Sequence, residues 1–202
     1  MGIIVFLGDS ITEAGRKNSS NQLGEGYVNI FAEGLKNSAR QWNIVNRGVD
    51  RYVTEQVAQS LHRDCISLHP DYVSILVGVN DIGLIAQAPV SQQEKLYMLE
   101  DSIRFYHEML FDLSRETQAR VITLEPFVFP ENGKYTDWVP WQKKMSKNIQ
   151  KLSRNYGAFF IPVQEPMEKK IREMGHSTIT TDCIHLTSTG QKILAELIKA
   201  SF

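Results

Sequence analysis

Apolar residues gather in five short runs that are rich in β-branched side chains, at positions 3–7, 44–45, 72–77, 120–124 and 158–162. Each run is apolar on both faces, which is typical of a parallel strand buried between two layers. Between the runs, apolar positions spaced by threes and fours predict helices over 27–36, 92–117, 139–155 and 188–200. The second of these helices begins at a capping-box pattern, in which Ser91 is followed three residues later by Glu94.

Strands that alternate with helices predict a parallel sheet covered on both faces. Five strands favour a doubly wound order, so we expect an α/β fold: a flavodoxin-like three-layer α/β/α sandwich with a five-stranded parallel sheet. The chain has 202 residues and no internal repeat or low-complexity linker. This length predicts a single domain over residues 1–202.

Composition and charge exclude several classes of function. Apolar residues make up 42% of the chain, and a net charge of −1 offers no electrostatic footprint for nucleic acid. No apolar run approaches the roughly 18 residues of a membrane span. Cys65 and Cys183 are too few for a disulfide framework or a zinc pattern, and Met1 leads into the first strand without a secretory signal. We therefore expect a cytoplasmic protein without nucleic-acid partners; the oligomeric state stays unknown at this level.

Residues suited to catalysis follow three successive strands. Ser10 lies directly after the first run in Gly8-Asp9-Ser10-Ile11, Gly48 follows the second run, and Asn80 follows the third. The carboxyl ends of parallel strands lie at one edge of a sheet, where ligands bind in such folds. Asp182 and His185 precede the last helix. Ser10, Gly48 and Asn80 are therefore expected to converge on one site.

These residue types suit acyl transfer through serine. A hydroxyl is a weak nucleophile, so Ser10 needs a base, and His185 is the candidate because an unperturbed imidazole titrates near neutrality. Asp182 would orient the imidazole and stabilise its cation. The Ser10 N–H, the Gly48 N–H and the Asn80 side-chain amide are the candidate oxyanion donors. The order Ser…Asp…His is that of α/β-hydrolases, but the second glycine of their G-x-S-x-G motif is absent.

Each motif alone has a simpler explanation. Gly-Asp-Ser is common in turns and helix caps, Asp-x-x-His also fits a cap before a surface histidine, and Gly48 and the pair Asn80-Asp81 fit loops. The aromatic residues Phe127, Phe129, Tyr135, Trp138 and Trp141 favour core packing, with a pocket wall as the alternative. The remaining histidines show no metal-ligand spacing, so we expect neither a metal nor an organic cofactor.

The four blocks together resemble the SGNH hydrolases, also called the GDSL family of esterases and lipases. The first block resembles residues 5–12 of this chain, with Ile11 where leucine is usual; the other blocks resemble residues 46–48, 78–81 and 182–185. The resemblance implies Ser10 as nucleophile, Gly48 and Asn80 as oxyanion donors, and Asp182 and His185 as the rest of the triad.

The resulting hypothesis is a serine hydrolase that cleaves carboxylic esters of small acyl groups through an acyl-enzyme intermediate. By analogy with the family, acetyl esters of sugars are one expected substrate class. A lysophospholipase or acyl thioesterase of the same family is the first alternative. A non-catalytic carbohydrate-binding protein on the same fold is an alternative from another class, and the intact residue set argues against it.

Overall fold

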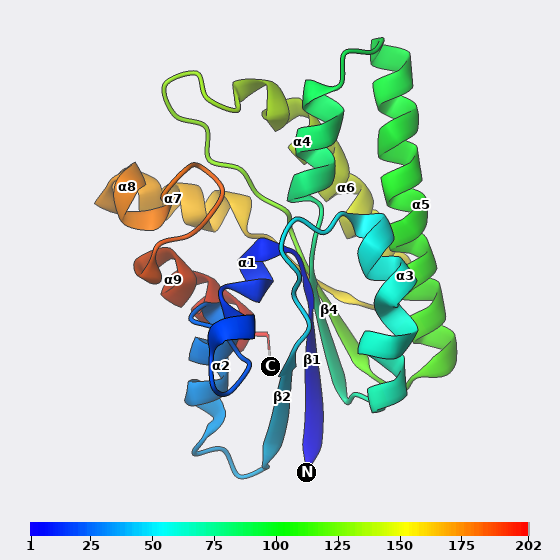
Figure 1. The fold of residues 1–202 in the computed structure, drawn as a ribbon, viewed down its shortest axis with the longest axis vertical. Coiled ribbons are helices and arrows are strands. Elements are labelled where there is room, and N and C mark those ends of the chain that lie inside the picture. Colours follow the sequence, from blue (N-terminus) through cyan, green and yellow to red (C-terminus); the bar gives the residue numbers. More distant parts are fainter. Residues whose placement is uncertain (202) are drawn as a thin grey trace.

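A computed structural model describes residues 1–201 of this chain, and its centre is a sheet of five parallel strands (Figure 1). The strands are β1 Gly2–Gly8, β2 Trp42–Asn46, β3 Tyr72–Leu76, β4 Arg120–Leu124 and β5 Phe159–Ile161. They confirm the predicted runs to within two residues at each end. Most β-branched side chains of β1, β3 and β4 are buried because helices cover both faces of the sheet, whereas Ile44 and Val45 of the edge strand β2 are half-buried.

The strands lie in the order β2-β1-β3-β4-β5, which is the flavodoxin-like order expected from the sequence. The central strand β1 pairs with β2 on one side and with β3 on the other, for example Ile4 with Ile44 and with Tyr72. After β1 the chain moves to one side of the sheet, and after β2 it crosses to the other. The carboxyl ends of β1 and β3 therefore flank the switch point where ligands bind in such sheets.

Helices form the two outer layers. The α-helices are α1 Ser10–Glu13, α2 Tyr27–Leu35, α3 Thr54–Asp64, α4 Val79–Gln87, α5 Gln92–Glu116, α6 Val139–Asn155, α7 Gln164–Met174, α8 His176–Ile179 and α9 Ser188–Lys199. Short 3-10 helices cover Arg16–Asn18, Ile66–Leu68 and Thr136–Trp138. In Figure 1, α2 and α9 pack together on one side of the sheet, and α3 and α5 pack together on the other.

Three longer helices, α3, α4 and α7, are not among those predicted from periodicity. Helix α7 buries only Met167, so it carries no apolar stripe that a periodicity search could find. Helix α4 follows β3 almost without interruption, and its apolar residues merge with those of the strand. Asn80 and Asp81 consequently lie in the first turn of α4 rather than in a loop, which corrects the interpretation from sequence.

The aromatic residues after β4 belong to the core, as the sequence favoured. Phe127, Phe129, Trp138 and Trp141 are all at most 7% exposed, and Phe127 and Phe129 stack with ring centroids 5.1 Å apart. Tyr135 packs on Trp138, with the two ring centroids 4.4 Å apart. These side chains anchor the long connection between β4 and α6 over the carboxyl edge of the sheet.

Candidate active site

Ser10 stands at the first position of α1, immediately beyond the carboxyl end of β1. Asp9 caps this short helix, because its Oδ1 accepts a hydrogen bond from the Ile11 N–H at 3.0 Å. The first N–H of a helix has no acceptor within the helix. Among residues 1–201 the Ser10 N–H has no other acceptor either. This donor is therefore free to bind a ligand beside the Ser10 hydroxyl.

Asp182 and His185 lie on a tight loop between α8 and α9. Asp182 Oδ1 accepts hydrogen bonds from the backbone N–H groups of Ile184 at 3.0 Å and His185 at 2.7 Å. The base of the loop is closed by an antiparallel bridge between Thr180 and Leu186. Between the two site residues, Cys183 has a φ of 81°, which is uncommon for a residue other than glycine. The loop thus turns sharply enough to bring the carboxylate against the ring of His185.

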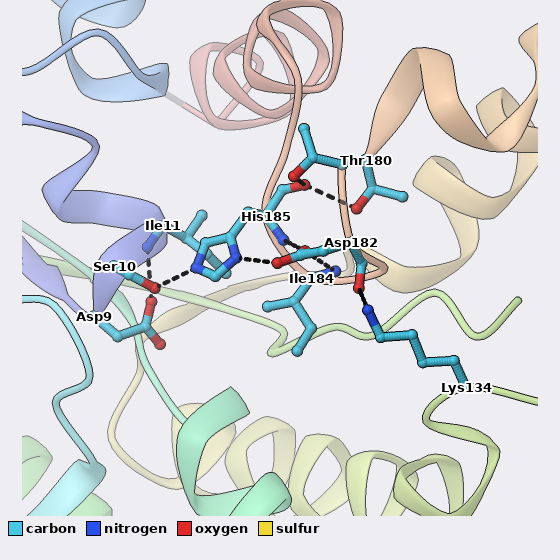
Figure 2. Close-up of polar contacts among 9 residues, drawn as sticks. Asp9, Ser10, Ile11, Lys134, Thr180, Asp182, Ile184 and His185 are labelled. Carbon is cyan, nitrogen blue, oxygen red and sulfur yellow. Dashed lines mark hydrogen bonds and ion pairs between the residues drawn. The ribbon is translucent and has the colours of Figure 1, made fainter.

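Figure 2 shows the His185 ring between Ser10 and Asp182, with one ring nitrogen toward each. The Ser10 Oγ lies 2.9 Å from His185 Nε2, and His185 Nδ1 lies 2.7 Å from Asp182 Oδ2. An ionised carboxylate can only accept, so Nδ1 must carry the proton that it shares with Asp182. In the neutral ring Nε2 is then the acceptor, and the Ser10 hydroxyl donates to it. The structure thus brings together the three residues expected from the sequence.

The pKa of Asp182 is lowered from its ordinary value. Partial burial acts to raise this pKa, but the hydrogen bonds from the His185 ring and from the backbone N–H groups of His185 and Ile184 outweigh burial. Asp182 is therefore ionised at neutral pH. An ionised Asp182 holds the tautomer in which His185 Nε2 can receive a proton.

The connection between β4 and α6 braces the loop that carries Asp182. The Phe129 N–H donates to the Cys183 carbonyl oxygen at 2.8 Å. Lys134 Nζ donates to the Asp182 carbonyl oxygen at 3.1 Å, as Figure 2 shows. His176 Nε2 lies 2.8 Å from the Phe129 carbonyl oxygen on the same connection. These contacts hold the backbone at Asp182 and at Cys183. No sequence motif indicated Lys134 or His176 as support for the site.

The structure does not support Gly48 as an oxyanion donor. The Gly48 N–H donates to Asn46 Oδ1 at 2.9 Å, so this donor is already engaged. A Cβ atom at Gly48 would overlap the backbone nitrogen of Glu13 and the backbone of Thr12, so the glycine allows close packing against α1. The backbone N–H of Arg51, farther along the same connection, has no acceptor within residues 1–201, and its φ is 63°.

Asn46 organises this side of the site, and sequence reasoning gave it no role. Its side chain is buried, and its Nδ2 donates to the carbonyl oxygens of Thr12 at 2.7 Å and Leu23 at 2.9 Å. With its Oδ1 on Gly48, it ties the end of β2 to α1 and to the segment before α2. The motif at 46–48 indicated that this segment belongs to the site, but only the fold shows that Asn46 links β2, α1 and the segment before α2.

Asn80 lies at the carboxyl end of β3, in the first turn of α4. Its Nδ2 donates to the Tyr52 carbonyl oxygen at 2.9 Å. A side-chain amide has two N–H groups, so one remains for a ligand. The neighbouring Asp81 is buried and already engaged, because its Oδ2 accepts from the Thr54 N–H at 3.0 Å and the Thr54 hydroxyl at 3.1 Å. Asn80 is therefore available to the site, whereas Asp81 fixes α3 to α4.

Asp9 lies buried directly beneath Ser10. Burial raises its pKa from 3.8 to about 7; the charge of Asp81 raises it further, while the hydrogen bond from Ile11 and the proximity of His185 act to lower it. Asp9 therefore titrates close to neutral pH. Its carboxyl group shapes the turn that presents Ser10.

A cavity of about 260 Å³ opens beside Ser10 and His185. Its other walls come from α1, the segment before α2 and the start of α9, and the lining residues are Ile11, Ala14, Glu25, Gly26, Leu186, Ser188 and Gln191. None of the aromatic residues after β4 lines this cavity. This cavity therefore gives no support to the alternative in which they form a pocket wall.

Within residues 1–201, no group of three or more His, Cys, Asp or Glu side chains is placed to hold a metal ion. No helix in the same part of the chain has the length and apolar character that crossing a membrane requires.

Comparison with known proteins agrees with this geometry. The model of the GDSL-like Lipase/Acylhydrolase family matches residues 6–193. An acetylxylan esterase from Geobacillus stearothermophilus is 25% identical over 206 residues, covering 95% of this chain and 90% of that protein.

Solved structures show the same fold. A candidate GDSL-like lipase from Parabacteroides merdae superposes with a TM-score of 0.88 at 24% identity, covering 99% of this chain and 94% of that one. The crystal structure of an acetylxylan esterase from Geobacillus stearothermophilus gives a TM-score of 0.86 at 21% identity, covering 98% and 93%. Together with the family match over most of the chain, these likenesses show that the protein belongs to the GDSL-like lipase/acylhydrolase family and is a carboxylic ester hydrolase.

Proposed function

We propose that this protein is a serine esterase in which Ser10 is the nucleophile, His185 the general base and Asp182 the residue that orients the base. The observation that carries the proposal is the continuous hydrogen-bonded chain from Ser10 Oγ through the His185 ring to Asp182 Oδ2. Such a chain activates the serine hydroxyl because the imidazole acts as a general base and accepts the hydroxyl proton during attack.

The proposed reaction proceeds in two halves. Ser10 Oγ attacks the ester carbonyl carbon as its proton passes to His185 Nε2, and the carbonyl electrons move to the oxygen. When this oxyanion collapses, the bond to the alcohol oxygen breaks and that oxygen takes the proton from Nε2. Water then attacks the acyl-Ser10 ester with His185 again as base, which releases the carboxylic acid and restores the Ser10 hydroxyl.

The oxyanion requires donors beside Ser10. The free Ser10 N–H and the second N–H of the Asn80 amide are the proposed donors. The third proposed oxyanion donor is the backbone N–H of Arg51, in place of the Gly48 N–H expected from the sequence. Arg51 directly precedes Tyr52, whose carbonyl oxygen contacts Asn80.

The proposed substrates are acetyl esters of sugars. The acetylxylan esterase named above supports this class, and alanine variants of a serine, an aspartate and a histidine in such an enzyme are described as catalytic mutants. Polar groups also line the small cavity beside Ser10, namely Glu25, Ser188 and Gln191. A long acyl chain would instead favour an extended apolar groove beside the serine.

A fluorophosphonate probe and a substrate panel test the proposal. We expect the probe to label wild-type protein stoichiometrically at Ser10, and Ser10→Ala to lose labelling and several orders of magnitude in kcat. Ser38→Ala, which changes an exposed serine remote from the site, is the matched control and should behave as wild type.

In p-nitrophenyl esters of increasing acyl length, kcat/KM should be greatest for acetate and fall with longer chains. A folded Ser10→Ala variant with wild-type turnover would refute the serine mechanism. A maximum at long acyl chains or at thioesters would favour the lysophospholipase or thioesterase alternative.

A further inference from the structure

The cavity beside Ser10 lies on the side of the site where the alcohol half of an ester must be. His185 Nε2 hands its proton to the departing alcohol oxygen, so that oxygen must come within hydrogen-bond distance of Nε2. The cavity is lined by both Ser10 and His185. Asn80 and the connection after β2 do not line it, so the proposed donors other than Ser10 lie outside this pocket.

The size and lining of the cavity restrict what it can hold. Its volume of about 260 Å³ is below the roughly 300–1,000 Å³ typical of sites for drug-sized ligands. It therefore fits one small ring rather than a long chain. Three of its side chains beyond Ser10 and His185 are polar, which suits a group that carries several hydroxyls.

Gln191 is the buried polar group of this cavity. It lies in the first turns of α9 and is 8% exposed. Its Oε1 accepts a hydrogen bond from the backbone N–H of Tyr27 at 2.9 Å, 164 residues away in sequence. This bond fixes the orientation of the amide, because a backbone N–H requires the oxygen and not the nitrogen. Nε2 is then the polar atom that remains, and it has no acceptor among residues 1–201.

Gly26 makes this arrangement possible. A Cβ atom at Gly26 would lie 2.6 Å from the Ala14 Cβ and 3.1 Å from Gln191 Oε1. The first distance is shorter than real Cβ contacts, and the second would require the Gln191 amide to shift slightly. The absence of a side chain at Gly26 thus lets the Gln191 amide reach Tyr27 while lining the cavity.

Glu25 complements Gln191 at the mouth of the cavity. Its side chain is exposed and makes no hydrogen bond or ion pair within residues 1–201, so its carboxylate can accept from a ligand. A sugar hydroxyl both donates and accepts. A donor on one wall and an acceptor on another would therefore bind a polyol from two sides.

We propose that this cavity is the subsite for the alcohol half of the substrate, and that Gln191 Nε2 donates to a sugar oxygen while the Glu25 carboxylate accepts from a sugar hydroxyl. The inference rests on the proposed function, since it assigns the part of the ester that departs from Ser10. Gln191 and Glu25 thereby select for a polyol leaving group, whereas Ser10, His185 and Asp182 carry out the chemistry on any small ester.

The test compares two acetate esters that differ only in the leaving group. Acetylated methyl xyloside offers hydroxyls to the cavity, whereas p-nitrophenyl acetate offers none. The variants are Gln191→Met, which has a similar length but no hydrogen-bonding groups, and Glu25→Ala, which changes an exposed residue. Gln191→Glu retains an acceptor for the Tyr27 N–H and controls for the loss of that structural bond.

We expect each of the three variants to lower the ratio of kcat/KM for the sugar acetate to kcat/KM for p-nitrophenyl acetate by about tenfold, the worth of one or two hydrogen bonds. In all three variants kcat/KM for p-nitrophenyl acetate should fall less than kcat/KM for the sugar acetate, and the melting temperature of Gln191→Glu and Glu25→Ala should stay close to wild type. A ratio unchanged within twofold in Gln191→Met and Glu25→Ala overturns the inference, as does an equal loss on both esters.

The proposed function fails separately from this inference. If wild-type protein cleaves p-nitrophenyl acetate but not the sugar acetate, the proposed substrate class is wrong. If wild-type protein cleaves both esters and no variant changes the ratio of the two kcat/KM values, the substrate class stands and the assignment of Gln191 and Glu25 is wrong.

Discussion

The buried carboxyl group of Asp9 should make the stability of this protein depend on pH, and Asp9→Asn should remove that dependence. The pKa of Asp9 is raised from 3.8 to about 7 in the folded state because burial penalises the charge. Below pH 3.8 the group is neutral in both states. Between pH 3.8 and 7 only the unfolded chain gives up the proton, so the stability due to this group is lost as pH rises through that window.

The magnitude follows from the shift itself. A difference of about three pKa units corresponds to a loss of about 4 kcal/mol once pH exceeds 7, and to about 1.7 kcal/mol near pH 5. The asparagine introduced by Asp9→Asn would keep the cap on the Ile11 N–H, since Asn and Asp are similar helix caps. The stability of Asp9→Asn relative to wild type should therefore increase by about 2.5 kcal/mol from near pH 5 to near pH 8.

Urea unfolding at the two pH values, followed by circular dichroism, measures this difference. Asp137→Asn is the control, because Asp137 is exposed and forms no ion pair within residues 1–201; it should show no such trend. If the free-energy difference between Asp9→Asn and wild type were the same at both pH values, Asp9 would be ionised in the folded protein and the reasoning would be refuted.

Substitutions at three further positions test the roles given to single residues. Asn80→Ala should reduce kcat by about 10²- to 10³-fold with little change in KM if its free N–H stabilises the oxyanion; a loss of melting temperature with kcat intact would show a purely structural residue. Gly48→Ala should cost about 1–3 kcal/mol by forcing a Cβ against α1, and denaturant unfolding that equals wild type would contradict the packing role. Cys183→Gly should stay within about 1 kcal/mol of wild type because glycine accepts a φ of 81°, whereas Cys183→Val should lose about 2 kcal/mol or more; equal melting temperatures for these two variants would argue against strain there.

The sequence was sufficient for the parts of the fold and site that depend on regular geometry. Continuous apolar runs mark buried strands, and the carboxyl ends of parallel strands share an edge, so the sequence is enough to expect Ser10 and Asn80 just beyond two strands that prove to be adjacent. The spacing of Asp182 and His185 allows one short loop to bring the two side chains into contact. The structure realises that contact at 2.7 Å.

The hydrogen-bond partners of individual polar atoms could not be predicted from the sequence, because they depend on the orientation of each side chain in the fold. Gly48 looked like a donor, yet its N–H is used by Asn46, two residues earlier. The contact between Gln191 and Tyr27 joins segments that no local pattern relates. Helices α3 and α7 were not predicted because each buries only one or two large apolar side chains, namely Val57 and Leu61 in α3 and Met167 in α7.

The bond between Ser10 and His185 joins residues that are 175 positions apart. A chain leaving the ribosome exposes Ser10 well before His185, and it cannot assemble the triad until the segment before α9 has emerged and docked. Loss of α9 from such a chain would remove the support of the loop that carries His185, although β1 to β4 could already be paired. Esterase activity in a translation reaction would thus report the docking of α9, and not merely the formation of the sheet.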